Sequence, residues 1–198
     1  MFVIHTMKVG DRVSNAFRAV PGRWVTLAAA STMLVTLVSG CGQTQDLTKQ
    51  FMTVDNSTKT VTIKVIGGYN AINDRMNFNG YANGQMKITV PVGYTVNLDF
   101  QNSGGIPADV GIYDSHQQLA FKKAGESVLN IDENAELGVH PGDSQKYSFV
   151  ADRTGTFEME NLINFFPEFA QGKQNRNVGM WDVFQVVQNG TPQITAQN

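Results

Sequence analysis

The side chains most able to react or to bind a metal in this 198-residue chain are those of one cysteine, three histidines and eight methionines. Thiolate, imidazole and thioether groups are the donors that bind copper and other soft or borderline metals. A lone cysteine can instead be a nucleophile, a buried apolar residue or a site of covalent anchoring. The role of Cys41 therefore decides whether a thiolate is available inside a fold.

The sequence before Cys41 predicts a lipid anchor. Arg12, Arg18 and Arg23 precede an uncharged, largely apolar run over residues 24–38, and Ser39-Gly40 lead into the cysteine. A basic segment, a short apolar segment and small residues are typical of a secretory signal peptide. The run is shorter than the roughly 20 residues of a membrane span.

The order Val-Ser-Gly-Cys resembles the bacterial lipobox, whose cysteine receives a diacylglycerol. We therefore predict a lipoprotein signal peptide over residues 1–40 and lipidation of Cys41, with two or three acyl chains giving a stable anchor. The domain would then be extracytoplasmic and tied to a cell membrane. The alternative is an unmodified cysteine in an apolar segment.

The charge of the remaining chain argues against a nucleic-acid partner. Residues 1–40 contain four basic side chains and one acidic one, which leaves 11 basic and 16 acidic side chains from Cys41 onward, a net charge of −5. No basic patch is visible, whereas nucleic-acid binding requires one. The 158 residues from Cys41 to Asn198 are enough for one domain.

The pattern after Cys41 indicates an all-β domain. Residues 41–58 are polar and predict a tether, residues 59–190 predict the domain, and residues 191–198 predict a C-terminal tail. Short alternating runs bounded by Gly, Pro, Asn or Asp predict seven or eight strands in an antiparallel β-sandwich. These runs are 60–68, 84–102 (two strands), 108–114, 126–131, 145–151, 155–161 and 179–187, and only residues 161–172 favour a helical turn.

Three stretches resemble the sulfocyanins, a family of blue-copper proteins within the cupredoxin superfamily. They are FNGYANGQMKITVPVGYTVNLDFQNSGGIPADVGIY, HPGDSQKYSFVADRTGTFEMEN and GMWDVFQVV, and together they lie within residues 78–187. The resemblance implies a cupredoxin-like Greek-key β-sandwich, copper as the family cofactor and electron transfer as the family activity.

The resemblance also implies positions for the four copper ligands. A type 1 centre needs two imidazoles, a thiolate and a weak axial Met. Here the position of the first family His is Ala108, that of the Cys is Asn161, and that of the Met is Met180. No His lies between Asn161 and Met180, and Cys41 is predicted to be acylated. We therefore expect no type 1 copper and no other cofactor.

The remaining donors offer only a weak alternative metal site. His116 and His140 could combine with Met159 or Met180 to bind Cu(I), because thioethers favour that ion. Both histidines lie in polar loop sequences, DSHQQ and GVHPGD, where exposed side chains are the simpler interpretation.

Residues 161–177 replace the family's metal-binding loop and contain Phe165, Phe166 and Phe169. These side chains either fill the vacated pocket or form an apolar docking surface for a protein partner. No G-x-S-x-G, H-E-x-x-H or Walker motif is present, so we predict no enzyme activity. The favoured hypothesis is a membrane-anchored, copper-free binding or accessory module of an envelope or respiratory assembly. The alternative is a copper-binding electron-transfer or copper-carrier protein with an unusual His/Met site.

Overall fold

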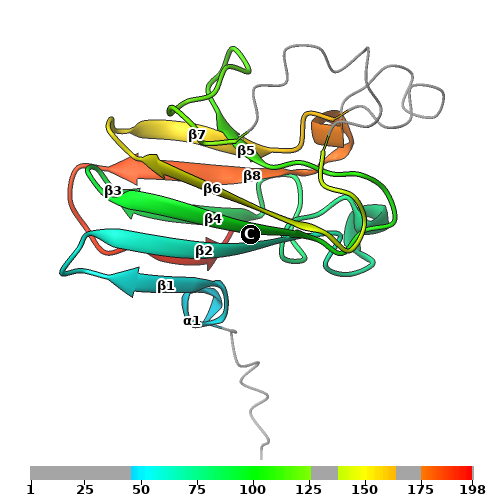
Figure 1. The fold of residues 1–198 in the computed structure, drawn as a ribbon, viewed down its shortest axis with the longest axis horizontal. Coiled ribbons are helices and arrows are strands. Elements are labelled where there is room, and N and C mark those ends of the chain that lie inside the picture. The colour runs from blue at the N-terminus through cyan, green and yellow to red at the C-terminus, as the bar shows by residue number, and fades with distance from the viewer. Residues whose placement is uncertain (1–45, 126–137, 164–174, 198) are drawn as a thin grey trace, which may run out of the picture. The chain divides into compact units, whose positions relative to one another are not determined.

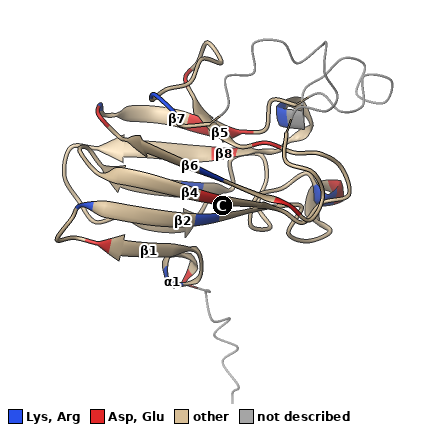
Figure 2. Cartoon of the chain, viewed as in Figure 1, with Lys and Arg blue, Asp and Glu red and all other residues tan. Residues whose placement is uncertain are grey.

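The computed structural model describes residues 46–125, 138–163 and 175–197 (Figure 1). Residues Gln43–Asn198 form one compact unit, and every contact discussed below lies within it. Charged residues make up 16% of the chain, and Figure 2 shows them scattered between long uncharged stretches of ribbon. The fold is therefore held by apolar packing between sheets.

Two sheets form the domain. The first has the order β1-β2-β4-β6 and the second β5-β7-β8-β3-β9. The strands are β1 (Met52–Asp55), β2 (Thr60–Gly67), β3 (Met86–Pro91), β4 (Thr95–Asn102), β5 (Gly111–Tyr113), β6 (Ser144–Val150), β7 (Gly155–Glu160), β8 (Trp181–Val187) and β9 (Gln193–Ala196). The described helices are α1 (Leu47–Phe51) and the 3-10 turns η1 (Ile72–Arg75) and η3 (Asn175–Val178).

Alternation of side chains explains why these strands pack as a sandwich. Every second residue of β4 and β8 is buried, so each strand turns one face to the core and one to solvent. Phe121 lies in the middle of the core, with its ring stacked on Phe149 at 5.3 Å and edge-on to Phe157 at 4.9 Å. The predicted β-sandwich is confirmed, and nine strands are present in the described residues.

The predicted antiparallel arrangement is only partly correct. β2 pairs with β4 in parallel, and β3 pairs with β8 in parallel, whereas the other pairs are antiparallel. Alternation reports which face of a strand is buried but not the direction of its neighbour. The run at 126–131 lies outside the described residues.

The two chain ends of the domain are part of the fold, which corrects the predicted boundaries. Residues 47–55 of the expected tether form α1 and β1, with Leu47 and Phe51 buried. Residues 193–196 of the expected tail form β9, which pairs with β3. The Thr48 hydroxyl joins the two ends: it accepts a hydrogen bond from Ile194 N at 2.8 Å and donates one to Ile194 O. Short elements with few apolar residues give a weak sequence signal.

The loop after β2 is shaped by asparagines. Asn73, Asn79 and Asn83 adopt left-handed backbone conformations, which Asn tolerates better than most residues. Asn79 is buried, accepts from Ile66 N at 2.6 Å and donates to Lys64 O at 2.9 Å. The loop therefore has a fixed path, and it delivers the residues at positions 74–76 to one end of the sandwich.

Candidate functional site: a metal-site position without metal donors

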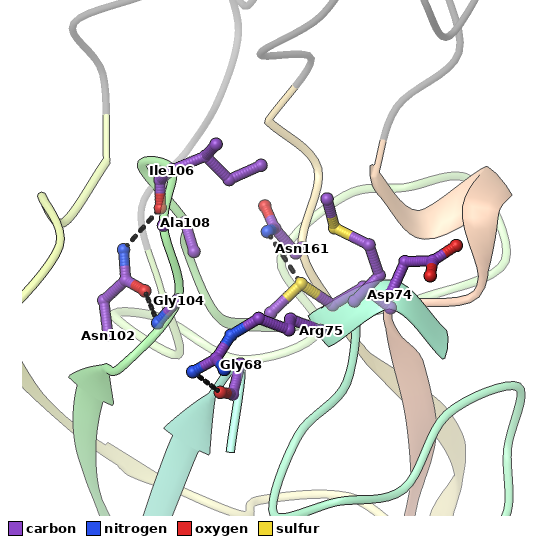
Figure 3. Close-up of a pocket in the computed structure, with 11 residues that line it drawn as sticks. Gly68, Asp74, Arg75, Asn102, Gly104, Ile106, Ala108 and Asn161 are labelled. Carbon is purple, nitrogen blue, oxygen red and sulfur yellow. Dashed lines mark hydrogen bonds between the residues drawn. The ribbon is translucent and has the colours of Figure 1, made fainter. Parts of the chain in front are cut away.

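A cavity of about 240 Å³ lies at this end of the sandwich (Figure 3). Its lining includes Ala108, Asn161 and Met180, the residues predicted to occupy three family ligand positions. The full lining is Gly68, Asp74, Arg75, Met76, Asn102, Gly104, Gly105, Ile106, Ala108, Asn161 and Met180. The structure thus brings together three residues that are up to 72 positions apart in sequence.

Strand pairing places these residues. Glu160, the last residue of β7, pairs with Trp181, the first of β8, so Asn161 lies opposite Met180 just beyond both strands. Asn161 N donates to Met180 O at 3.1 Å. Ala108 precedes β5 and is fixed by two backbone hydrogen bonds to Val139, of 2.8 and 3.1 Å.

The Asn161 side chain is fully buried and directed at sulfur. Its Nδ2 donates to Met180 Sδ at 3.1 Å, and its Oδ1 accepts from Ile163 N at 3.0 Å. The amide is therefore satisfied within the protein, and the thioether is already engaged as an acceptor. This arrangement stabilises the cavity wall without a bound ion.

Sequence analysis missed the residues that hold the cavity rim. Arg75 donates from Nη2 to Gly68 O at 3.0 Å and to Ser103 O at 2.9 Å, which ties two loops together. The buried Asn102 donates to Ile106 O at 2.8 Å and to Val139 O at 2.7 Å. Asn102 ends the DFQN stretch that resembles the family motif, whereas no sequence signal marked Arg75.

The donors in the cavity do not fit type 1 copper. That centre requires two imidazoles and a thiolate in one plane. Among the described residues, the cavity offers the thioethers of Met76 and Met180, neutral amides and the carboxylate of Asp74, but no imidazole and no thiolate, and Ala108 has no donor atom.

The weak alternative metal site is not assembled in the described structure. His116 lines a groove with Glu158 and Arg176, whereas His140 lines a separate groove with Asp143. Met159 is fully buried in the core. Among the described residues, no group of three His, Cys, Asp or Glu side chains is placed to hold a metal ion.

Two further sequence predictions fall on residues whose structure is not described. Cys41 and the three phenylalanines Phe165, Phe166 and Phe169 lie outside the described ranges. Lipidation and the docking role of residues 161–177 therefore remain predictions. The described end of that loop is η3, which begins at Asn175.

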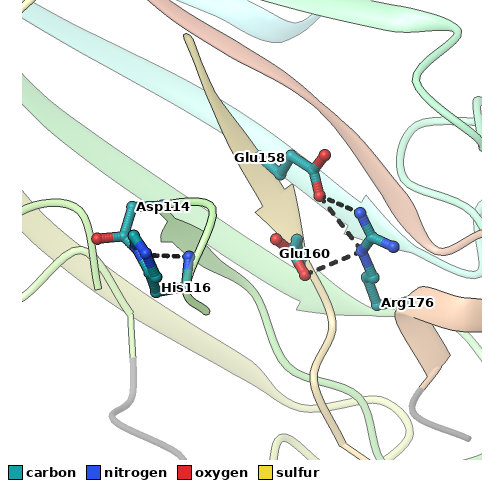
Figure 4. A network of polar contacts seen from close by, with 5 residues as sticks. All are labelled: Asp114, His116, Glu158, Glu160 and Arg176. Carbon is teal, nitrogen blue, oxygen red and sulfur yellow. Dashed lines mark hydrogen bonds and ion pairs between the residues drawn. The ribbon is translucent and has the colours of Figure 1, made fainter. Parts of the chain in front are cut away.

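Arg176 fixes the C-terminal end of that loop to the sheet (Figure 4). Its backbone N donates to Asn161 O at 2.9 Å. Its guanidinium donates hydrogen bonds to Glu158 Oε2, with a distance of 3.2 Å from Nε to that oxygen. The guanidinium carbon also lies 5.3 Å from the centre of the Trp181 ring. Nε also lies 3.3 Å from Glu160 Oε2. Arg176 therefore forms ion pairs with two carboxylates on the same face of β7.

Glu160 is 1% exposed, and this burial raises its pKa to about 8, with a further contribution from the neighbouring Glu158. Arg176 acts in the opposite direction and lowers the pKa of Glu160. Hydrogen bonding to Glu158 in turn raises the pKa of Arg176. The pair of carboxylates thus retains a proton near neutral pH.

Replacing Arg176 by Met is expected to destabilise the domain by about 1–3 kcal/mol at pH 8, between the values for surface and buried ion pairs. The loss should be smaller at pH 5, because a protonated Glu160 needs no counter-ion. Urea unfolding at the two pH values measures this. Arg153→Met is the matched control, because Arg153, like Arg176, lies over aromatic rings, those of Phe121 and Phe157, but forms its ion pair with the exposed Asp152. Equal losses for both variants would contradict the buried-pair assignment.

Asp182 is a second buried carboxylate that sequence analysis did not identify. Its side chain is fully buried, and Oδ1 accepts a hydrogen bond from Met86 N at 2.8 Å. Oδ2 has no hydrogen-bond partner among the described residues. Burial raises the pKa of Asp182 to about 8, although the bond from Met86 lowers it in part. The carboxyl group therefore joins β3 to β8 in its neutral form.

The two sheets, the parallel β3–β8 pair and the cavity at the ligand positions define a cupredoxin-like β-sandwich. A family model described as the Sulfocyanin (SoxE) domain matches residues 47–132. Over these 86 of the 198 residues, the chain is similar to the sulfocyanins. The match ends before β6, so Asn161 and Met180 lie outside it.

Several solved structures are similar to the chain. They include auracyanin from Roseiflexus castenholzii (18% identity, 64% of this chain and 96% of that one, TM-score 0.41) and a copper nitrite reductase from Nitrosomonas europaea (21%, 64% and 41%, TM-score 0.43). A multicopper oxidase from Campylobacter jejuni is also similar (12%, 69% and 28%, TM-score 0.48).

The chain spans about a third of the length of the first multicopper and blue copper oxidases that it matches, with coverage of 31%, 30% and 33%. Among curated proteins, no sequence matches the chain significantly. Within the described residues, no helix has the length and apolar character needed to cross a membrane.

Proposed function

We propose that this chain is a lipid-anchored, extracytoplasmic sulfocyanin-like domain that lacks type 1 copper and acts as a binding or accessory module of an envelope or respiratory assembly. The observation that carries the proposal is the meeting of Ala108, Asn161 and Met180 at one cavity. The first two cannot supply the imidazole and thiolate that the family uses.

The contacts of Asn161 support loss of copper. In a blue-copper centre the thiolate is the strong ligand and the axial thioether the weak one. Here an amide occupies the thiolate position and donates a hydrogen bond to the thioether sulfur of Met180. This hydrogen bond stabilises the end of the sandwich where family members ligate copper. Without the thiolate, that end has no redox group.

The lipid anchor is supported by the sequence around Cys41 and by the order of elements after it. The first described helix, α1, begins six residues beyond Cys41. The only thiol in the chain therefore precedes the first described element of the domain. A module without its own redox centre acts through the partners that it contacts, and residues 161–177 are the proposed contact for a protein partner.

Metal titration tests the copper-free assignment. The purified full-length chain in detergent, titrated with Cu(II) and Cu(I), is expected to bind neither ion tightly and to show no intense blue absorption. The reason is the absence of an imidazole–thiolate set. Bound metal measured after desalting gives the stoichiometry.

Two results of that titration would change the proposal. An intense blue band would mean that Cys41 or residues 164–174 contribute to a centre that the donor analysis excludes. Tight, colourless Cu(I) binding that is lost in His116→Ala or His140→Ala would instead make the protein a copper carrier.

A further inference from the structure

The outer face of the first sheet has a basic groove beside α1. The groove has a volume of about 430 Å³ and is lined by residues of α1, β1, β2, β4 and β6. Its charged residues are Lys49, Lys64, Lys146 and Asp99. Figure 2 shows basic positions on α1, β2 and β6 of this sheet. The groove is thus positive, whereas the chain from Cys41 onward carries a net charge of −5.

Strand register explains how the lysines come together. Lys64 pairs with Asp99, and Asp99 pairs with Lys146, so the three side chains form a row across β2, β4 and β6. Lys146 Nζ lies 3.2 Å from Asp99 Oδ2. Lys64 makes no ion pair with any described residue and is exposed. One acid therefore lies between two cations, and an excess of positive charge remains.

Lys49 pairs with the exposed Asp46 at 3.3 Å, and Lys146 pairs with Asp99, but the lysine side chains still extend into solvent. The side chains of Lys49 and Lys146 are 85% and 78% exposed. Their neighbours on the outer face are small and uncharged, such as Thr62 and Ser144. No described carboxylate other than Asp99 lines the groove. Long basic side chains on a neutral background match a plane of negative headgroups.

The length of the tether brings this face to a membrane. Cys41 is six residues before Leu47, the first residue of α1, and six extended residues span about 20 Å. Lys49 lies within α1 itself. A membrane that holds Cys41 is therefore close to the basic groove, whereas the acidic remainder of the domain is repelled by a negative surface.

We propose that the groove of Lys49, Lys64 and Lys146 docks on negatively charged lipid headgroups and fixes the orientation of the anchored domain. This inference rests on the proposed lipid anchor. Docking turns the sheet β1-β2-β4-β6 toward the membrane and leaves the sheet β5-β7-β8-β3-β9 facing away from it.

Lysine acetylation on vesicles tests the orientation. The mature form that begins at Cys41 has one thiol, which can be coupled to a maleimide lipid in vesicles of phosphatidylcholine alone or with 30% phosphatidylglycerol (about a third anionic lipid). We expect Lys49, Lys64 and Lys146 to be acetylated at least about fivefold more slowly on the anionic vesicles, since each lysine near such a surface contributes about that factor. Lys122 and Lys123, exposed in the loop after β5, are the internal control.

A charge variant completes the test. Lys64→Gln with Lys146→Gln should abolish the remaining protection of Lys49, whereas Lys122→Gln with Lys123→Gln should leave it unchanged. Protection that is equal on neutral and anionic vesicles, or that persists at 1 M salt, would overturn the proposal. No protection at all would also overturn it and would leave the groove to an acidic protein partner.

The chemical coupling separates this inference from the lipid anchor. Because the maleimide supplies the attachment, the acetylation result does not depend on lipidation in cells. Mass spectrometry of the N-terminal peptide from membranes tests lipidation of Cys41 directly. A lipidated peptide without vesicle-dependent protection would reject only the docking. Protection without a lipidated peptide would reject the anchor and show that the groove still binds anionic lipid.

Discussion

Replacing Asp182 by Asn is expected to make the domain more stable than the wild type at pH 8, by on the order of 2–4 kcal/mol. In the wild type, the buried carboxyl must lose its proton as the pH rises through about 8. The amide has nearly the same shape, can still accept from Met86 N and remains neutral at every pH. The variant therefore avoids a buried negative charge that has no cation beside it among the described residues.

The sign of the pH effect follows from the direction of the shift. The pKa of Asp182 is about 8 in the folded state and about 3.8 in the unfolded state. The folded state therefore holds the proton more tightly, and the stabilisation is complete below pH 4 and is lost as the pH rises toward 8. Glu160, with a pKa of about 8, contributes in the same direction. The wild-type domain should be more stable at pH 5 than at pH 8.

Urea unfolding between pH 5 and pH 9 measures this prediction. The Asp182→Asn variant should exceed the wild type by only about 1–2 kcal/mol at pH 5 and by more at pH 8. Asp99→Asn is the matched control, because Asp99 is on the outer face and pairs with an exposed lysine. Parallel profiles for wild type and Asp182→Asn would show that Asp182 is ionised in the folded protein at neutral pH.

Combining Ala108→His with Asn161→Cys is expected to create a metal site at the cavity. The substitutions add an imidazole and a thiolate to the cavity that already contains the thioether of Met180. We expect Cu(II) or Co(II) to bind at least about a thousandfold more tightly than to the wild type, because coordination by soft donors is strong. A thiolate-to-metal charge-transfer band reports the new bond.

The control for this gain of function introduces the same two residue types, His and Cys, but places the Cys away from the cavity. Ala108→His with Ser148→Cys places the thiol on the outer face of β6, away from the cavity, and should give no charge-transfer band. Both double variants are made in Gln43–Asn198, which lacks Cys41 and forms one compact unit. If the variant at Asn161 is folded and still gives no band, the three residues do not share a metal-sized site.

Residue patterns predicted the parts of the fold in which burial alternates along a strand. The runs that became β2, β3, β4, β6, β7 and β8 each have apolar residues at every second position. α1 and β1 were missed because they are short, and the direction of β2 beside β4 leaves no mark on either strand. Nothing in a single sequence distinguishes a five-residue helix from a polar tether before its contacts are known.

The ligand positions were predicted by resemblance, and the structure places Ala108, Asn161 and Met180 at one cavity. The electrostatic features were not predictable in the same way. Glu158 and Glu160 alternate like polar residues on any exposed face, yet Glu160 is buried because η3 brings Arg176 over it. Burial of a charged residue depends on contacts between distant segments, so sequence spacing does not reveal it.

The bond between Thr48 and Ile194 has a mechanical consequence for the proposed anchor at Cys41. A load that pulls the domain away from its attachment at Cys41 enters through α1, and the hydroxyl of Thr48 passes part of it to β9. From β9 the load spreads to β3 and into the second sheet, since the two strands are paired over four residues. Tension at the N-terminus is thus shared by both layers instead of peeling β1 from its edge.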